Sequence, residues 1–222
     1  DDWLVTCYRE NCGLFWRGVP MESILLHWMG DERGNAMPRP HHATPIAVPI
    51  GTQMLHAAGL TMAARYQGED RIACTFFGDG ASSEGDFHEA CNFASNLKIP
   101  VVFVCQNNFW AISTPSKINS AAPTFAQRGL SYGMPCLQCD GNDLFAVNKT
   151  TREAVARAAR GESLQGLDVL HAVLTELAIR VPSIASAQWH AEQGHAVLSV
   201  LPGDEPEARA FECDRELVAV DG

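Results

Sequence analysis

Two short motifs, each at the end of an apolar run, constrain the fold of this 222-residue chain more than any other feature. Residues 78–80 read Gly-Asp-Gly after the apolar run 72–77, and Asn107-Asn108 follow the apolar run 101–105. The 26 residues between the motifs carry apolar side chains at the spacing of one helix face. This order of strand, helix and strand predicts a β-α-β unit, which requires a parallel sheet.

The segment between the motifs also carries signals for the two ends of the helix. Asp86 can cap the helix, and Glu89 three residues later completes a capping-box pattern. Lys98 suits the last turn, and Pro100 stops the helix. The apolar residues of the predicted buried face are Phe87, Ala90, Cys91, Ala94 and Leu97.

Both motifs are expected at the carboxyl ends of parallel strands, where open α/β sheets bind their ligands. The carboxylate of Asp79 and the amide oxygen of Asn108 are hard ligands that suit a Mg²⁺ ion, which keeps further positions for phosphate oxygens. The glycines allow the backbone to approach such a phosphate closely. Strand-end turns without a ligand are the alternative, because Gly-Asp-Gly is also ordinary turn chemistry.

The spacing of the two motifs resembles the thiamine diphosphate motif, Gly-Asp-Gly followed by Asn-Asn. The longer segments 78–90 and 106–115 resemble the E1 α subunit of the 2-oxo acid dehydrogenase complexes, the family of the pyruvate, branched-chain and acetoin enzymes. The resemblance implies an open, mostly parallel α/β sheet of the thiamine diphosphate-binding fold. It covers residues 1–162 as a cofactor-binding domain and leaves 163–222 as a divergent C-terminal segment.

The resemblance implies which residues hold the cofactor and its metal. Asp79 and Asn108 would bind Mg²⁺ together with the carbonyl oxygen of Trp110. Tyr8 and Arg9 match a pair that binds the diphosphate, since an arginine fork suits phosphate oxygens; a surface salt bridge is the alternative for Arg9. The other implied cofactor contacts are Val48, Ile50, Gly80, Ala81 and Gln106.

Three of these positions carry further expectations. Val48 and Ile50 align with residues that contact the aminopyrimidine ring, and core packing is the alternative for both. Gln106 stands where many family members carry an arginine, so it brings a hydrogen-bond donor without the charge. The resemblance also implies a site for a monovalent cation such as K⁺, formed by Thr52, Gln53 and the carbonyls of Ala47 and Pro49.

The activity implied by the resemblance is that of a 2-oxo acid dehydrogenase E1, acting on pyruvate or a branched-chain 2-oxo acid. It decarboxylates the 2-oxo acid oxidatively and acylates the lipoyl domain of an E2 protein reductively. The implied partner is an E1 β subunit in an α₂β₂ heterotetramer. The acid/base glutamate is expected from that β subunit, so no catalytic residue is assigned to this chain.

Two other classes of function stay open at this point. The chain could be a non-catalytic cofactor-binding or assembly remnant that lacks the histidine loop of the family. It could also be a transketolase-like module, although the sequences of residues 83–86 and 111–115 favour the E1 family over this interpretation.

Composition excludes several partners and compartments. The net charge of −10 argues against nucleic acid and anionic membranes as partners. No apolar run approaches the length of a transmembrane helix, and no secretory signal opens the chain, so a cytoplasmic location is expected. The first residue is Asp1 and not Met, so we expect a processed or truncated N-terminus.

The remaining pattern predicts an alternation of strands and helices. Cys136 and Cys139 form a C-x-x-C spacing, for which alternating strand residues are favoured over a metal or redox pair. Asp143 is expected to cap the last helix. The predicted elements are strands at 3–8 and 134–140 and helices at 20–30, 52–67, 124–132 and 144–160, with a polar loop at 113–122.

The character of the chain changes after residue 162. The family would continue with a strand and then a loop that carries a histidine, and the sequence predicts neither. An amphipathic helix is predicted instead, and beyond residue 182 no period is found, so we expect limited proteolysis to cut there first. Residues 163–222 could be a lineage-specific replacement, a fused segment or the product of a reading-frame change. The helix prediction rests on Leu167, Leu170, Leu174, Leu177 and Val181.

Overall fold

A five-stranded parallel sheet forms the centre of the chain in a computed structural model that describes residues 2–36, 41–160 and 172–178. The strand order is β1-β2-β3-β7-β6, and every neighbouring pair is parallel. The predicted open α/β sheet is therefore confirmed. The strands are β1 (Trp3–Val5), β2 (Ala73–Gly78), β3 (Val101–Asn107), β6 (Cys136–Asp140) and β7 (Ala172–Ala178).

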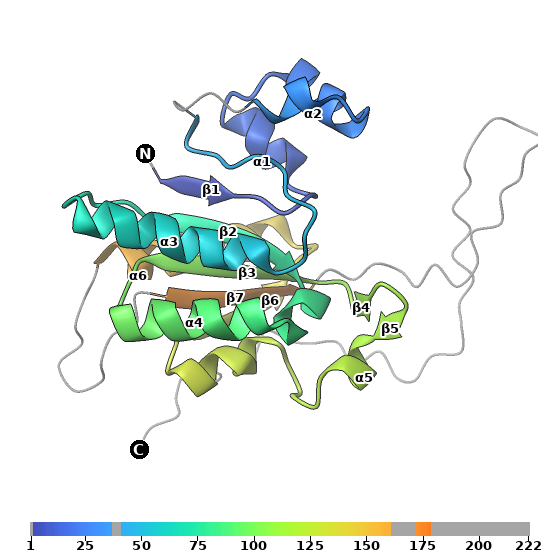
Figure 1. Cartoon of the computed structure of the whole chain (residues 1–222). Helices are drawn as coiled ribbons and strands as arrows, with labels where there is room; N and C mark the ends of the chain where they lie inside the picture. The colour runs from blue at the N-terminus through green and yellow to red at the C-terminus, as the bar shows by residue number, and fades with distance from the viewer. Residues whose placement is uncertain (1, 37–40, 161–171, 179–222) are drawn as a thin grey trace, which may run out of the picture. The chain divides into compact units, whose positions relative to one another are not determined.

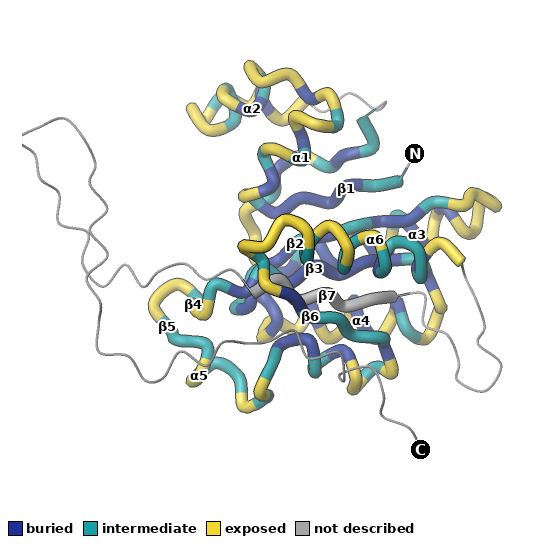
Figure 2. Tube along the Cα trace, turned by 180° about the vertical axis from the view of Figure 1, so that it is seen from behind, coloured by how far each residue is buried: buried dark blue, intermediate teal, exposed yellow. Residues whose placement is uncertain are grey.

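Helices cover both faces of this sheet. Helices α3 (Thr52–Tyr66) and α4 (Gly85–Leu97) lie in front of the sheet in Figure 1. Helix α6 (Leu144–Arg160) covers the opposite face, which Figure 2 shows from behind. The sheet is thus buried on both sides, as parallel sheets in α/β proteins are.

The central strand β3 shows why its apolar run is continuous. Phe103 packs with Phe87 of α4 in the cluster between the sheet and helices α3 and α4. Val102 and Val104 point to the other face and pack with Ala154 of α6. Successive strand side chains alternate between faces, so both parities must be apolar when both faces are covered.

The predicted β-α-β unit is confirmed, but its capping box is wrong. Helix α4 begins at Gly85 with Glu84 at the N-cap, and no side chain in the described residues caps it. Asp86 lies inside the first turn, where its charge only favours the positive end of the helix. Lys98 closes the helix in the left-handed conformation, with φ of 52°, before Pro100.

The segment between β1 and α3 packs on the outer edge of the sheet. It contains α1 (Asn11–Trp16), α2 (Met21–Trp28) and the 3₁₀ helix η1 (Glu32–Asn35). The predicted helix at 20–30 is confirmed by α2. Helices α1 and α2 contribute Leu14 and Ile24 to a separate apolar cluster, which is formed by Leu4, Leu14, Val19, Ile24, Ala43 and Ile46.

The connections at the carboxyl edge of the sheet are mostly short helical turns. The 3₁₀ helix η3 (Asp79–Ser83) follows β2, and η4 (Ala126–Tyr132) stands where a helix at 124–132 was predicted. The region predicted as a polar loop at 113–122 contains the second strand of a small hairpin and one short helix, and the first strand of the hairpin lies just before it. These are β4 (Trp110–Ala111), β5 (Thr114–Pro115) and α5 (Ser116–Asn119).

Two local predictions about β6 and α6 are confirmed. The Asp143 carboxylate accepts the backbone N–H groups of Phe145 at 2.8 Å and Ala146 at 3.1 Å, which caps α6. Cys136 and Cys139 lie on opposite faces of β6, because one joins the cluster under α4 and the other the cluster under α6. Two thiols on opposite faces cannot share a metal or form a redox pair.

The predicted amphipathic helix after residue 162 is wrong over residues 172–178. Strand β7 lies there and pairs in parallel with β3 on one side and β6 on the other. Leu174 and Leu177, two of the five residues behind the helix prediction, are therefore strand residues. The strand that the family pattern calls for is present, and the first compact unit of the chain runs to residue 179.

The position of β7 predicts a large effect of truncation. A chain that ends at residue 165 loses the strand that joins β6 to β3, whereas a chain that ends at residue 179 keeps it. We expect the shorter chain to melt without a cooperative transition and the longer one to melt as cooperatively as the full chain. Thermal melts followed by circular dichroism test this, and equal cooperativity in both truncations would contradict it.

Several expectations about the C-terminal segment lie outside the described residues. These are the remaining part of the predicted helix, the absence of a histidine loop, and the first proteolytic cut beyond Val181. Among the helices that the structure does describe, none is both long and apolar enough to cross a membrane.

Candidate functional site

Three adjacent parallel strands bring the predicted site residues to one edge of the sheet. In the register of the sheet, Val5 of β1 pairs with Thr75 of β2, and Gly78 of β2 pairs with Gln106 of β3. Tyr8-Arg9, Asp79 and Asn108 follow the ends of β1, β2 and β3 respectively. The strand order thus places all three groups at the carboxyl edge, where such sheets bind ligands.

Asp79 is a buried carboxylate that lacks a full set of partners. Its residue is only 1% exposed. Oδ1 accepts the backbone N–H of Asn108 at 3.4 Å, while Oδ2 is buried and has no hydrogen-bond partner among the described residues. Burial raises the pKa of Asp79 above its usual value, and the Asn108 N–H and the charge of Arg9 act against this. A buried carboxylate in this state is stabilised by taking up a proton or by binding a cation.

The two asparagines shape the turn that follows β3. Asn107 Oδ1 accepts the N–H of Phe109 at 2.8 Å, and Asn108 Oδ1 accepts the N–H of Trp110 at 3.0 Å. Phe109, which follows the two asparagines, has a φ of 67°, a left-handed conformation that is uncommon for a bulky residue. These bonds hold the Asn108 amide oxygen beside the Trp110 backbone, and the oxygen retains a second lone pair.

The donor set at this edge fits a hard divalent cation. Asp79 offers a carboxylate oxygen that no described residue occupies, and Asn108 offers an amide oxygen on the neighbouring strand end. The described part of the chain contains no group of three or more His, Cys, Asp or Glu side chains that could hold a metal. A cation at this site would therefore need carbonyl oxygens and ligand oxygens to complete its coordination, as Mg²⁺ with a diphosphate does.

Tyr8 and Arg9 form a preassembled pair. Arg9 Nη1 donates to the Tyr8 hydroxyl at 3.0 Å, and the guanidinium carbon lies 4.6 Å from the centre of the Tyr8 ring. Arg9 is exposed, and its charge offsets part of the rise that burial causes in the pKa of Asp79, so it lies within electrostatic reach of that carboxylate. The alternative of a surface salt bridge finds no support, because no carboxylate of the described residues pairs with Arg9.

Gly80 allows the two strand-end turns to touch. A Cβ at this position would lie 2.6 Å from Ala111 Cβ and 3.1 Å from Ala111 Cα, so only a glycine fits against β4. Ala81, the next residue, is 5% exposed and belongs to the core cluster under α3 and α4. The turn η3 is thereby fixed between the core and the β4–β5 hairpin.

Replacing Gly80 with alanine is therefore expected to separate η3 from β4 and to lower the melting temperature. Gly59→Ala is the matched control, since a Cβ there meets no described atom within 4 Å. Because Gly59 lies inside α3, its replacement should stabilise the chain by roughly 0.5–1 kcal/mol. Thermal melts of both variants test the contact, and an unchanged melting temperature for Gly80→Ala would argue against it.

Val48 and Ile50 do not pack in the core. They are 59% and 43% exposed in the loop that leads into α3, which removes core packing as their explanation. The loop lies against the start of α4, directly after η3, because a Cβ on Gly51 would come within 3.3 Å of Glu84 Cβ and 3.4 Å of Asp86 Cβ. Apolar side chains are thus exposed close to the turn that carries Asp79.

Three groups of the implied cation site lie together, namely the Gln53 side chain and the carbonyls of Ala47 and Pro49. Gln53 is 1% exposed, and its Nε2 donates to the carbonyls of Ala47 at 2.6 Å and Pro49 at 2.9 Å. Its Oε1 is buried and finds no partner in the described ranges. The amide nitrogen bridges the two carbonyls, so it holds the loop before α3 in the way that a cation bound to those carbonyls would.

A network around Arg128 supports η3 from the side, and the sequence did not reveal it. The guanidinium donates to the carbonyl and, at 2.9 Å, to the hydroxyl of Ser82, whose own hydroxyl donates to the carbonyl of Asp79 at 2.6 Å. Arg128 Nη2 also reaches the carbonyl of Asn119 at 3.4 Å. The bonded residues are 46 positions apart along the chain, so no local pattern could have indicated the contact.

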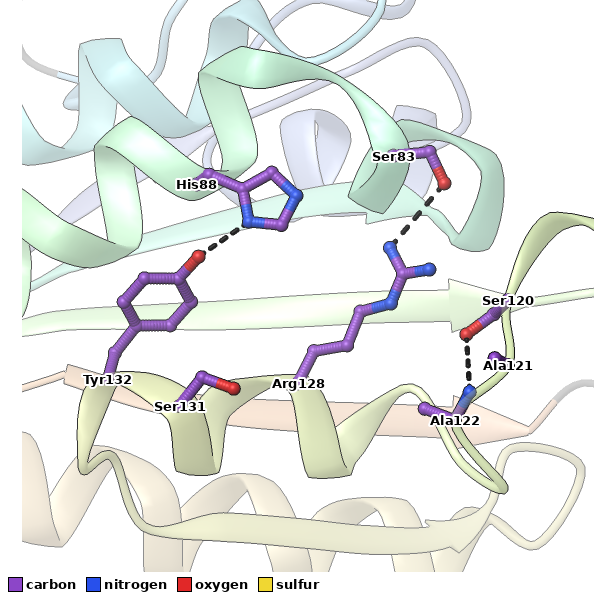
Figure 3. Close-up of a pocket in the computed structure, with 8 residues that line it drawn as sticks. All are labelled: Ser83, His88, Ser120, Ala121, Ala122, Arg128, Ser131 and Tyr132. Atoms are coloured by element: carbon purple, nitrogen blue, oxygen red, sulfur yellow. Dashed lines mark hydrogen bonds between the residues drawn. The ribbon is translucent and has the colours of Figure 1, made fainter.

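Figure 3 shows the hollow of about 400 Å³ beside this network, lined by Ser83, His88, Ser120, Ala121, Ala122, Arg128, Ser131 and Tyr132. It contains none of the predicted cofactor residues. His88 and Tyr132 face each other across one side, with 2.5 Å between Nδ1 and the hydroxyl.

Comparison with family models divides the chain into two parts. The model of the dehydrogenase E1 component matches residues 1–165, which include every predicted site residue. A second model, that of the ATP phosphoribosyltransferase subunit HisZ C-terminal domain, matches residues 178–222. Apart from residue 178, this second stretch lies outside the part of the chain that the structure describes.

Curated relatives match the same N-terminal part. The 3-methyl-2-oxobutanoate dehydrogenase subunit alpha of Mycobacterium tuberculosis is 45% identical over 161 residues, which cover 72% of this chain and 44% of that protein. The pyruvate dehydrogenase E1 component subunit alpha of Acholeplasma laidlawii is 42% identical over 162 residues, which cover 73% of this chain and 47% of that protein. The chain spans less than half the length of these relatives.

Solved structures support the fold. A transketolase variant from Pichia stipitis superposes with a TM-score of 0.58 at 19% identity, covering 80% of this chain and 28% of that chain. A benzoylformate decarboxylase from Polynucleobacter necessarius gives a TM-score of 0.51 at 14% identity, and the match covers 81% of this chain and 30% of that chain. At these identities the likeness concerns the fold alone. The match over residues 1–165 decides the family, and the chain belongs to the dehydrogenase E1 component family.

Proposed function

We propose that this chain is the cofactor-holding part of a 2-oxo acid dehydrogenase E1 α subunit. It binds thiamine diphosphate and Mg²⁺ and takes part in the oxidative decarboxylation of pyruvate or a branched-chain 2-oxo acid. The acyl group then passes to the lipoyl domain of an E2 protein. The names of the relatives support this assignment, since they include both pyruvate and 3-methyl-2-oxobutanoate dehydrogenases.

The buried carboxylate of Asp79 is the single observation that carries the proposal. Asp79 is 1% exposed, and one of its carboxylate oxygens has no partner among the described residues, so its ionised form costs stability unless a cation binds there. Its neighbours on both sides are groups that suit a metal-bound diphosphate. Asn108 lies on the next strand end, and Arg9 adds a positive charge from the strand on the other side.

Each of the chain's own groups has a definite role in this proposal. Asp79, Asn108 and the carbonyl of Trp110 would hold Mg²⁺, while Tyr8, Arg9 and Gln106 would donate to the diphosphate. Gly80 and Ala81 would bring the backbone of η3 to it, and Val48 and Ile50 would line the ring. Thiamine diphosphate, when bound, supplies the nucleophilic carbon and the electron sink for decarboxylation.

The proposed assembly completes the site from a second protein. We assign none of the described side chains as the acid or base for the proton transfers, and we give that role to a glutamate of an E1 β subunit in an α₂β₂ heterotetramer. The exposed Val48 and Ile50 leave one side of the cofactor site open, which suits a partner at that side. K⁺ bound beside Gln53 would stabilise the same loop.

We also propose that the chain divides into an E1 α-like cofactor domain over residues 1–162 and a divergent segment over 163–222. The two family matches, which cover different parts of the chain, support this division. Strand β7 lies in the segment 163–222, yet it pairs with β3 and β6 in the sheet of the cofactor domain.

The test is decarboxylation of pyruvate and of 3-methyl-2-oxobutanoate by this chain with its E1 β subunit. We expect turnover that requires Mg²⁺ and thiamine diphosphate and that disappears with Asp79→Ala. A chain that binds the cofactor without turnover on either substrate would instead be a non-catalytic member of the family.

A further inference from the structure

Glu10 is a buried carboxylate next to the Tyr8-Arg9 pair, and the proposed function gives it no role. The residue is 9% exposed and stands at the N-cap position of α1. Its side chain does not cap that helix. Burial raises the pKa of Glu10, and no described residue forms an ion pair with it. Keeping a carboxylate in such a place costs stability, so its contacts need an explanation.

The contacts of Glu10 point back toward the end of β1. Oε2 accepts the backbone N–H of Cys7 at 2.8 Å and the backbone N–H of Arg9 at 3.3 Å. Oε1 is buried without a partner in the described part of the chain. One oxygen thus holds the main chain on both sides of Tyr8, while the carbonyl of Glu10 accepts the N–H of Leu14 in α1.

The same short segment is fixed from its other side. The carbonyl of Cys7 accepts the N–H of Ala47, and the backbone of Thr6 bonds to the Thr44 hydroxyl at 3.2 Å. Among the described residues, the guanidinium of Arg9 is held by Tyr8, through its hydroxyl and its ring. The backbone N–H groups on both sides of Tyr8 are bonded by the Glu10 carboxylate, which therefore helps to set the direction in which Tyr8 and Arg9 leave the main chain.

We infer that Glu10 is a positioning residue for the diphosphate contact. Its carboxylate fixes the backbone of residues 7–9, so that Tyr8 and Arg9 already face the Asp79 end of β2 before a ligand arrives. Such preorganisation strengthens binding because less conformational freedom is lost when the ligand binds. The inference rests on the proposed function in one respect, namely that Arg9 contacts the diphosphate.

Two conservative variants test the length of the Glu10 side chain separately from its charge. Glu10→Asp keeps the negative charge but is one methylene shorter, so it cannot hold the Cys7 N–H at the same distance. Glu10→Gln loses the charge but keeps the length and an oxygen that accepts hydrogen bonds. If Glu10 acts through reach, the aspartate variant is impaired and the glutamine variant is nearly normal.

The experiment is a calorimetric titration of thiamine diphosphate with Mg²⁺ into the full chain with its E1 β subunit. We expect about a tenfold loss of affinity for Glu10→Asp and less than about threefold for Glu10→Gln; tenfold corresponds to about 1.4 kcal/mol. In an Arg9→Ala background, the effect of Glu10→Asp should fall below about twofold, because the group that Glu10 positions is gone.

A stability control separates positioning from general damage to the fold. Thr61 is fully buried in α3, where its hydroxyl donates to the carbonyls of Ala57 and Ala58 at 3.0 Å. Thr61→Ala should lower the melting temperature and leave the affinity unchanged. The thermal unfolding of both Glu10 variants is measured in parallel, so that each calorimetric titration is run well below the melting temperature of the variant.

The outcomes distinguish this inference from the proposed function. Equal losses for Glu10→Asp with and without Arg9, or a loss for Glu10→Gln that exceeds the loss for Glu10→Asp, would overturn the positioning role. So would wild-type affinity in Glu10→Asp. If the unmodified chain binds no Mg²⁺-dependent cofactor, or if Asp79→Ala binds it normally, the proposed function fails and the inference fails with it.

Discussion

Asp79→Ala and Asn108→Ala should each abolish the Mg²⁺-dependent binding of thiamine diphosphate. Each change removes a hard oxygen ligand from the cation that links the protein to the diphosphate. Asp79 makes the larger contribution, because it is the only charged ligand in the donor set and its Oδ2 has no other partner in the described residues. Calorimetry in the presence of the β subunit measures the affinity, and unchanged affinity in both variants would remove the cofactor assignment.

Asp79→Asn gives a sharper form of the same test, because it separates function from stability. Burial raises the pKa of Asp79 in the folded chain above its unfolded value. The stability linked to this group is therefore present below the unfolded pKa and is lost as the pH rises through the folded pKa. At neutral pH the ionised side chain destabilises the ligand-free protein, and the asparagine variant removes that charge.

The expected result for Asp79→Asn is a melting temperature at pH 7 that does not fall, together with a loss of Mg²⁺-dependent cofactor binding. At a pH near 3, where the carboxyl is protonated, any stability gain over the unmodified chain should disappear. A variant that melts well below the unmodified chain at neutral pH would show that Asp79 is held for the fold, and its burial would then not indicate a cation.

The sequence predicted the centre of the fold because several local signals agree there. The apolar runs that became β2 and β3 are bounded by glycine, asparagine and proline, and the segment between them has the period of a helix. The strand-end position of Asp79 and Asn108 follows directly from that order, and so does their contact. Parallel strands leave little freedom in where their carboxyl ends meet.

Strand β7 was missed because its pattern fits two structures. Leu174 and Leu177 are three residues apart and continue a helical spacing from Leu167 and Leu170. Pairing with β3 favours the strand, because the backbone of β3 is buried and needs hydrogen-bond partners on both edges. This requirement for a pairing strand arises from β3, some seventy positions earlier, so the sequence around β7 does not show it.

The support around the site was also beyond prediction, for a related reason. Asp86 had the spacing of a helix cap, but the N-cap of α4 is Glu84, two residues earlier, which places Asp86 inside the first turn. Glu10 would be expected in solvent, as most glutamates are, yet it is turned inward to bond the backbone beside Arg9. Side-chain direction at a helix end depends on the packing of the neighbouring segment, which the residue types alone do not fix.

Arg9→Ala is expected to weaken cofactor binding much more than it weakens the fold. A charge-assisted hydrogen bond contributes about 1.5–3 kcal/mol, which corresponds to roughly a ten- to hundredfold loss of affinity. Arg9 is exposed and pairs only with Tyr8 among the described side chains, so its removal takes little from the packed core. Titration of thiamine diphosphate and a parallel thermal melt measure the two effects on the same sample.

Arg33 provides the matched control for this prediction. Its side chain is 80% exposed and pairs with Asp31 at the start of η1, in the segment between α2 and α3 and not at a strand end. Arg33→Ala removes the same charge from the surface and should leave the affinity unchanged, which excludes a general electrostatic attraction of the diphosphate. If Arg9→Ala lowers the melting temperature sharply while the affinity holds, Arg9 supports the fold, and the diphosphate contact must come from another residue.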